Sequence, residues 1–523
     1  MDNKLEDNSK TETNSENKYT SSNTKRIAKN TLMLYFRQIL IMLVSLYTVR
    51  VVLNVLGAED YGIYNVVAGV VILFSFVNNA MSSGTQRFLN FYLGKKDLDK
   101  TNQVYSSSLL IHFFISLIFV ILAESVGLWF VNCKLNIPEN RHSVAMIVYQ
   151  FTILTTVFNI LKVPYNAVII AYERMSFFAG MSILEAVLKL GIVFLLSLTK
   201  FDKLIFYAFL LTCVAFITML SYKIFCNRKF EIAHFKKVAD KSFVKEQLAF
   251  SGWSLFGATA NVANSQGTNI VLNIFTNVTV NAAMGVANQV NSAVYSFVSN
   301  FQMAFNPQIV KSWASKELEY FYLLLIRAAK VSYYLLFFIA LPLYLNTDFV
   351  LSIWLKEVPN YAADFVRLTL IWSLIEAVNG PLFMAVQATG KIKFYQITIG
   401  IINLLNLPFV IIAFSAGANP LWLLYIKIAL NIFALVFRVE FCVKYISLSR
   451  VKFIFGCIVP VAIISLLSFT VTFFIGHFFV GLQYFFVTCI VSILITGLLV
   501  FFIGLSKNER NAILLKMKGK IKK

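Results

Sequence analysis

Apolar stretches of about 20 residues recur along nearly the whole chain, separated by short polar segments. A helix needs about 20 apolar residues to cross the hydrocarbon core of a bilayer. The chain is 58% hydrophobic and 14% charged, with a mean hydropathy of +0.73, which lies outside the usage of soluble globular proteins. Stretches such as 113–122 and 461–475 lack the alternation of a membrane β-barrel strand. These features predict an all-α polytopic membrane protein.

The stretches predict about 14 membrane-spanning helices, at 32–55, 62–83, 104–131, 144–163, 177–198, 203–225, 249–275, 280–304, 329–352, 364–388, 394–415, 420–443, 451–476 and 479–504. The polar first residues predict a disordered tail, because they offer little to bury. We expect a tail at 1–30, six-helix lobes at 31–230 and 249–446 joined by a basic linker at 231–248, two additional helices at 447–505, and a basic tail at 506–523.

The placement of basic residues predicts the orientation of the chain. Lys and Arg near span ends are retained on the cytoplasmic side of a membrane. Most of the Lys and Arg residues lie in the two tails and in the connections that follow even-numbered spans, which are all on one side of the membrane. Both termini are therefore expected in the cytoplasm. The net charge of +21 is explained by this topology and by anionic headgroups, and we expect no nucleic-acid partner. The six cysteines show no metal-ligand spacing and are interpreted as packing residues.

The chain contains two weakly similar blocks, offset by about 220 residues. Residues 52–54 match 271–273, and 96–99 match 316–319. Further along, Pro164, Ala171, Arg174 and Phe177 align with Pro381, Ala388, Lys391 and Phe394. Transporters are often built from such repeats, with the substrate bound where the repeats meet. The blocks predict that spans 1–6 and 7–12 are two repeats of parallel orientation, with spans 13 and 14 as an addition.

The stretch VLNVLGAEDYGIY at 52–64 resembles the first outer turn of polysaccharide biosynthesis flippases. These are the Wzx-type branch of the multidrug/oligosaccharidyl-lipid/polysaccharide (MOP) exporter superfamily. Phe88-Leu89 followed by Gly94-Lys95 is similar to the exit of the family's second span. The likeness covers roughly residues 30–445 and is diagnostic of family rather than of substrate. The additional helix pair resembles the lipid II flippase branch.

The resemblance implies a V-shaped pair of six-helix lobes around a cavity that opens alternately to either side. It further implies transport of an undecaprenyl-pyrophosphate-linked oligosaccharide across the bacterial inner (cytoplasmic) membrane, for O-antigen, capsule or exopolysaccharide synthesis. The expected partners are the lipid-linked oligosaccharide, membrane lipids and other polysaccharide assembly proteins.

Two arginines in the first span are the leading candidates for substrate binding. Charges at membrane depth cost about 2.5 kcal/mol or more, so they usually face an interior or a wet cavity. Arg37 and Arg50 lie about 20 Å apart along a helix axis. Because a guanidinium binds phosphate oxygens well, we expect Arg37 to receive the pyrophosphate and Arg50 to assist at the outer end. Snorkelling to headgroups or pairing with a carboxylate is the alternative.

Uncharged polar residues mark a second set of candidates. A stripe that includes Asn288, Ser292 and Tyr295 recurs at helical spacing along one face of the eighth span. Amides and hydroxyls suit sugar hydroxyls, and the alternative is hydrogen bonding between helices. The predicted sugar contacts are Asn78, Asn261, Asn264, Asn288, Ser292 and Tyr295.

Among the acidic residues within the predicted spans, three lie well away from the span ends. Glu185 is four residues from Lys189 and is interpreted as its structural partner. Glu124 and Glu376 have no basic neighbour in sequence, so either is a candidate for ion coupling. Glu376 is favoured because Pro381 follows and can interrupt the helix. A kink with a protonated carboxyl is the alternative.

Other classes of protein fit the sequence less well. No phosphate-binding GxxxxGK[ST] loop occurs, and no metal or cofactor motif is apparent. The membrane potential can assist export of an anion by about 2.3 kcal/mol per charge at 100 mV. A polymerase or glycosyltransferase would need an outer loop or catalytic cluster that the sequence lacks. A cation-coupled multidrug exporter of the same superfamily is the alternative transporter.

Overall fold

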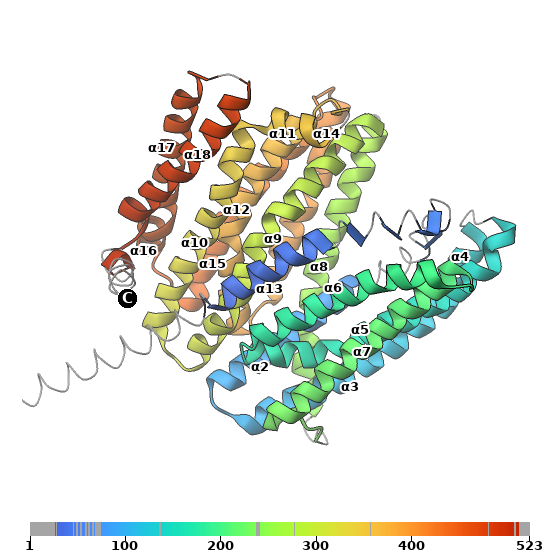
Figure 1. The fold of residues 1–523 in the computed structure, drawn as a ribbon. Coiled ribbons are helices and arrows are strands. Elements are labelled where there is room, and N and C mark those ends of the chain that lie inside the picture. Colours follow the sequence, from blue (N-terminus) through green and yellow to red (C-terminus); the bar gives the residue numbers. More distant parts are fainter. Residues whose placement is uncertain are drawn as a thin grey trace, which may run out of the picture. The chain divides into compact units, whose positions relative to one another are not determined.

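The structure is a computed structural model. It describes residues 27, 29–44, 47–48, 51–52, 55–57, 60, 63–64, 67, 75–134, 138–236, 241–276, 278–355, 357–479, 481–506 and 509–511, with the side chains of 75–80, 134, 197, 241–242 and 278 outside this description. The described residues form helices joined by short turns, and no strand occurs among them (Figure 1). This confirms the predicted all-α fold.

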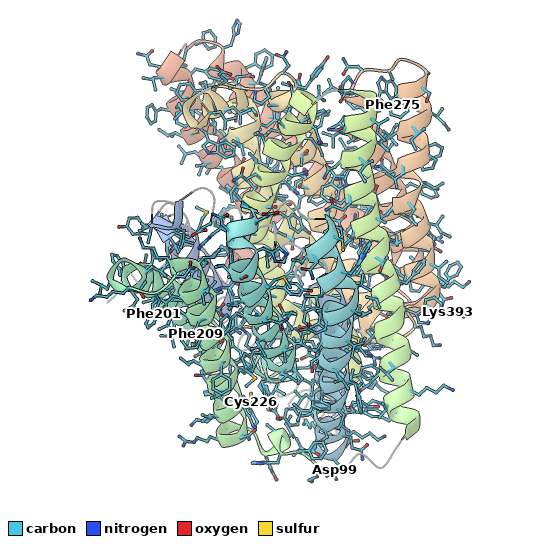
Figure 2. The ribbon with its side chains drawn as sticks, turned by 90° about the vertical axis from the view of Figure 1, so that its right-hand side faces the viewer. Asp99, Phe201, Phe209, Cys226, Phe275 and Lys393 are labelled. Atoms are coloured by element: carbon cyan, nitrogen blue, oxygen red, sulfur yellow. The ribbon has the colours of Figure 1, made fainter. Side chains whose placement is uncertain are left out.

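The first compact unit contains residues 1–258 and 303–317. After a helical segment at 29–44, its helices are α2 (Ser75–Gly94), α3 (Leu98–Leu122), α4 (Leu128–Lys134), α5 (His142–Ala171), α6 (Met175–Leu198) and α7 (Lys203–Lys229). A π-helical turn, Ala123–Gly127, joins α3 to α4. In Figure 2, Asp99 at the start of α3 lies at the same end of this unit as Cys226, whereas Phe201 lies at the other end.

The second compact unit contains residues 259–302 and 318–523. Its helices are α10 (Leu318–Leu345), α11 (Thr347–Trp354), α12 (Ala362–Thr389), α13 (Lys393–Leu404), α14 (Asn406–Ser415), α15 (Trp422–Ile446), α16 (Arg450–Phe453), α17 (Val459–Gly476) and α18 (Gly481–Leu499), with π-helical turns at Ile454–Ile458 and Val500–Gly504. Helices α8 (Lys241–Phe275) and α9 (Val278–Ala314) contribute residues to both units.

Nine described helical segments are long and apolar enough to cross a membrane, and each overlaps a predicted span. They are Leu98–Cys133, Glu139–Ala171, Met175–Leu196, Lys203–Lys229, Leu318–Leu345, Ala362–Thr389, Lys393–Ser415, Arg450–Gly476 and Gly481–Gly504. The other predicted spans overlap α2, α8, α9, α15 and the helical residues at 29–44.

Several helix boundaries differ from the sequence prediction; α10, for example, begins at Leu318 rather than at the predicted residue 329. Helix α2 continues to Gly94, beyond the predicted end at residue 83. Arg87 is buried within it, with its guanidinium over the rings of Phe91 and Phe250, so the charge is accommodated inside the helix packing. Helix α8 begins at Lys241, whereas the predicted span begins at residue 249. The end of the predicted basic linker therefore forms part of the helix.

The backbone confirms the predicted repeat. In the turn after α2, Lys96 is in the left-handed region at φ 56°, and in the turn after α9, Lys316 is in the same region at φ 62°. The same capping hydrogen bonds close both ends, from Asp97 N–H to the Tyr92 carbonyl and from Glu317 N–H to the Ser312 carbonyl. The sequence repeat pairs the same two lysines. A matching turn geometry at an equal offset indicates that the two six-helix halves share one fold.

The proline-containing helices extend this correspondence. Pro164 lies inside α5 and Pro381 inside α12. Each helix is followed by a left-handed residue, Glu173 at φ 56° and Gly390 at φ 77°. Each also accepts a thiol hydrogen bond next to its proline, because Cys226 of α7 donates to the Tyr165 carbonyl and Cys442 of α15 donates to the Leu382 carbonyl. The pair α5 and α7 therefore corresponds to the pair α12 and α15.

Each unit has its own apolar core. The core of unit 1 includes Val148, Tyr149 and Leu204, from α5 and α7. The core of unit 2 includes Phe365 and Leu423, from α12 and α15. Helices α17 and α18 pack against each other and against α10, so the two additional helices belong to unit 2 (Figure 1).

Candidate functional site

Two clusters of charged and polar side chains in the described helices, one in each unit, contain residues that the sequence analysis selected within spans. We call them the Arg37 cluster (Arg37, Lys162, Phe178, Ser182, Glu185, Lys189 and Tyr222) and the Glu376 cluster (Tyr295, Trp372, Glu376, Asn379, Tyr395, Lys427, Asn431 and Arg438). Charged groups at membrane depth are rare and functional by default. The two clusters are therefore the candidate site.

In the Arg37 cluster, the half-buried Arg37 lies against α6. Its guanidinium donates a hydrogen bond to Ser182 at 3.4 Å and lies 4.7 Å from the centroid of the Phe178 ring. It also interacts electrostatically with Tyr222 of α7. Residue 37 is therefore packed among side chains of its own unit.

Two lysines share the carboxylate of this cluster. Glu185 accepts a hydrogen bond from Lys189 at 2.8 Å, which confirms the predicted i,i+4 pair. Lys162 of α5 lies 3.6 Å from the other carboxylate oxygen and 5.8 Å from the centroid of the Tyr222 ring. Because one carboxylate faces two lysines, basic groups outnumber the carboxylate in this ion-pair network.

In the Glu376 cluster, the acidic residue is paired with an arginine that is distant in sequence. Arg438 of α15 lies 3.4 Å from Glu376 and donates to the Tyr395 hydroxyl at 2.8 Å. The Arg438 side chain is 9% exposed and that of Glu376 is 26% exposed. Glu376 thus has a basic partner that its sequence neighbours did not reveal.

Amides fix the two helices of this cluster in register. Asn379 donates to Glu376 at 3.1 Å and to Asn431 at 3.0 Å, and Asn431 donates to the Trp372 carbonyl at 3.3 Å. Trp372, Glu376 and Asn379 follow the i, i+4, i+7 spacing of one helix face. Buried amide pairs of this kind hold helices together within a membrane.

Lys427 completes the Glu376 cluster. Its ammonium lies 4.3 Å from the centroid of a Trp372 ring and interacts electrostatically with Glu376. Lys427, Asn431 and Arg438 follow the i, i+4, i+11 spacing of one face of α15. In this cluster too, a single carboxylate, that of Glu376, lies near two basic groups, Arg438 and Lys427.

Several predicted sugar contacts bind to neighbouring helices of unit 2. Asn261 accepts a hydrogen bond from Asn403 at 2.7 Å, and Asn264 accepts one from Asn406 at 3.1 Å. Tyr295 interacts electrostatically with Glu376 and Arg438 and hydrogen bonds to Gln302, so it joins the Glu376 cluster.

The remaining predicted site residues are dispersed. Asn288 is half-buried and Ser292 is exposed, both on α9. Glu124 is exposed in the π-helical turn after α3 and accepts a hydrogen bond from Gln150 at 3.3 Å. Arg50 and the side chain of Asn78 lie outside the described residues.

Sequence reasoning missed Lys162, Lys427, Arg438 and Tyr395 as members of these clusters. The signal was present for three of them, because Lys162, Lys427 and Arg438 are basic residues inside predicted spans, which is the criterion that selected Arg37. The sequence gives no comparable signal for Tyr395, whose hydrogen bond with Arg438 depends on the packing of α13 against α15.

Solved structures with this fold are membrane transporters. An outward-facing multidrug-resistance MATE-family transporter of the MOP superfamily is 12% identical, with a TM-score of 0.70 over 82% of this chain and 97% of that chain. A MOP-superfamily transporter from Pyrococcus furiosus is 12% identical, with a TM-score of 0.67 over 80% and 96% of the two chains. A variant of the Vibrio cholerae MATE transporter VcmN is 15% identical, with a TM-score of 0.64 over 81% and 98%.

Comparison with curated protein sequences finds no match. The family model MatE matches residues 34–195 and 268–412, which together make up more than half of the chain. The two matched segments fall in the two repeats described above. The chain therefore belongs to the MatE family of membrane transporters.

Proposed function

We propose that this transporter carries an anionic lipid-linked substrate, an undecaprenyl-pyrophosphate-linked oligosaccharide, from the cytoplasmic to the outer leaflet by alternating access. Its product would serve polysaccharide synthesis. One observation carries the proposal: in both clusters the carboxylate within the spans is outnumbered by basic groups. Glu185 faces Lys162 and Lys189, and Glu376 faces Arg438 and Lys427.

Such a charge balance favours a pyrophosphate over an organic cation. A cationic drug bound in a low-dielectric interior needs an uncompensated carboxylate, since opposite charges attract strongly there. Both carboxylates of the clusters already have basic partners. The excess cations would instead attract phosphate oxygens, to which Arg and Lys bind with charge-assisted hydrogen bonds.

Multidrug export is the second candidate, and the structural neighbours favour it. Two of them are described as MATE transporters, one of these as a multidrug-resistance transporter. The Pyrococcus furiosus protein, however, is described as having a binding pocket of reverse polarity that suggests a different function. That description is consistent with one fold serving substrates of either charge, so the charges of this chain carry more weight than its fold.

The test is accumulation of lipid-linked glycan in cells that lack this protein. We expect the intermediate to remain on the cytoplasmic leaflet and wild-type protein to relieve the block. Arg37→Ala should fail to do so although it is present in the membrane at normal levels, with roughly a tenfold or greater loss of transport, because one charge-assisted contact contributes about 1.5–3 kcal/mol.

Arg228→Ala is the matched control, since Arg228 is an exposed arginine in the last turn of α7. It should restore transport fully. Normal arrival of the intermediate at the outer leaflet in the deletion strain, with no second flippase present, would refute the proposal. Resistance to cationic drugs conferred by the wild-type protein would then support the second candidate.

A further inference from the structure

We propose that Lys427, lying over Trp372, is a second pyrophosphate-binding group of this transporter, located in unit 2. The inference deepens the proposed function and rests on it. The ligand class is a polyprenyl pyrophosphate, recognised through its phosphate oxygens.

Most basic side chains of the two clusters are paired with a carboxylate. Lys189 and Lys162 lie within 3.6 Å of Glu185, and Arg438 lies 3.4 Å from Glu376. Lys427 differs from them, because within the described part of the chain no carboxylate lies within ion-pair distance of its ammonium. Its close contact is the face of Trp372, at 4.3 Å from a ring centroid.

The nearby carboxylate of Glu376 already has an ion-pair partner. Glu376 accepts hydrogen bonds from both Arg438 and Asn379 through the same oxygen, Oε2. Arg438 is held in turn by the Tyr395 hydroxyl. Glu376 therefore interacts with Lys427 only at longer range, which stabilises the half-buried ammonium without forming an ion pair with it.

A π face stabilises a cation but accepts no strong hydrogen bond from it. A cation–π contact contributes about 0.5–2 kcal/mol, whereas a hydrogen bond between charged groups contributes about 1.5–3 kcal/mol. An ammonium carries three donors on a flexible stem. Lys427 can therefore keep its apolar stem against Trp372 and direct its donors to a phosphate.

The surrounding helices hold this lysine in place. Asn431, one turn after Lys427, donates to the Trp372 carbonyl, and Asn379 donates to Asn431. These bonds tie α15 to α12 at the level of the lysine. The ring and the ammonium are thus pre-organised, which reduces the entropic cost of binding a ligand.

Unit 1 contains a comparable arrangement. Arg37 lies 4.7 Å from the centroid of the Phe178 ring, and Glu185 of the same cluster is paired with lysines rather than with this arginine. Each repeat therefore presents a cation over an aromatic ring beside a neutralised carboxylate. The arrangement around Lys427 is therefore not peculiar to unit 2.

Binding of geranylgeranyl pyrophosphate to the purified full-length protein in detergent tests this inference. Calorimetric titration would give Kd for the wild type, Lys427→Gln, Lys427→Met and Lys427→Arg, with geranylgeraniol as the ligand that lacks phosphate. We expect both neutral variants to raise Kd roughly tenfold or more. Lys427→Arg should stay within about threefold of wild type, since the charge is kept.

Lys444→Gln is the matched control. Lys444 is an exposed lysine of the same helix and also lies near an aromatic ring, with 5.7 Å to the centroid of Tyr445. Its substitution should leave Kd unchanged. Size-exclusion elution and thermal unfolding identify any variant that fails to fold. If one of the two neutral variants at residue 427 fails to fold, the Kd of the other still tests the role of the charge.

The outcomes separate this inference from the proposed function. Equal Kd for wild type and both neutral variants, with weaker binding by Arg37→Ala, would overturn the role of Lys427 and leave the proposed function intact. Wild-type binding of geranylgeraniol but not of the pyrophosphate would overturn both. Competition by phosphatidylglycerol as strong as that by the prenyl pyrophosphate would assign Lys427 to a lipid headgroup and overturn the inference.

Discussion

At the scale of single residues, Arg141 joins three connections of unit 1. Its guanidinium donates to Asp60 at 2.6 and 2.9 Å and to Asp202 at 2.5 Å. Asp60 belongs to the sequence motif that carries the family resemblance, so this contact gives the motif's acidic residue a structural role. Burial alone would raise the pKa of Asp202, but hydrogen bonds from Arg141 and the backbone hold that pKa below its ordinary value.

Arg141→Ala should therefore destabilise the protein by about 2 kcal/mol, because two carboxylates lose their shared donor. The folded-state pKa of Asp202 is lowered, so its stabilising contribution is present above its unfolded pKa of about 4 and is lost as pH falls through the folded value. Thermal unfolding in detergent from pH 7 to pH 3 would measure this loss. Asp202→Asn should flatten the acidic part of the profile, and an unchanged profile would contradict the assignment.

At the scale of elements, a glycine allows α2 to approach α9 closely within unit 1. A Cβ atom on Gly94 would lie 2.7 Å from the Lys311 carbonyl oxygen and 2.9 Å from the Ala314 Cβ. Lys311 also forms an ion pair with the buried Glu173 at 2.8 Å, and Gln308 donates to the same carboxylate. The end of α9 is therefore held by α2 on one side and by the turn after α5 on another.

Gly94→Ala should separate these helices and destabilise the protein by about 1–3 kcal/mol, as overpacking generally does. The loss would appear as a lower thermal unfolding temperature. Gly191→Ala is the matched control, since a Cβ there meets nothing within 4 Å and the change favours a helix. Equal unfolding temperatures for the two variants would show that the close approach does not limit stability.

At the scale of the whole molecule, the distribution of cysteines makes the predicted orientation testable. The described structure has free cysteines at six positions, of which Cys133 is exposed and Cys226, Cys442 and Cys457 are buried. Cys133 is the last residue of the candidate span Leu98–Cys133, which begins with α3, and it lies in the connection predicted to face outward.

A membrane-impermeant maleimide should therefore label wild-type protein from outside intact cells, and Cys133→Ala should abolish that labelling. The expectation follows because a thiol must be both exposed and on the accessible side of the membrane to react. Labelling of Cys133 only in inside-out vesicles would invert the predicted topology and place the termini outside.

The sequence by itself determined the membrane class, the helical fold and the repeat. Hydrophobic length and helical periodicity are local properties, so α6, α7, α12 and α18 lie within a few residues of their predicted spans. The repeat was also readable, because Lys96 and Lys316 occupy the same special turn and each turn depends on residues close in sequence. The pairing of Glu185 with Lys189 was predictable for the same reason.

Only the tertiary structure decided which charges meet. Glu376 and Arg438 are 62 residues apart and come together because α12 packs against α15. The approach of Lys162 to Glu185, and of Lys427 to Trp372, likewise depends on the rotation and register of neighbouring helices. Those quantities are set by side-chain packing over whole helix faces, to which residues distant in the sequence contribute. A single sequence therefore shows that a span contains a charge, whereas the fold selects the partner of that charge.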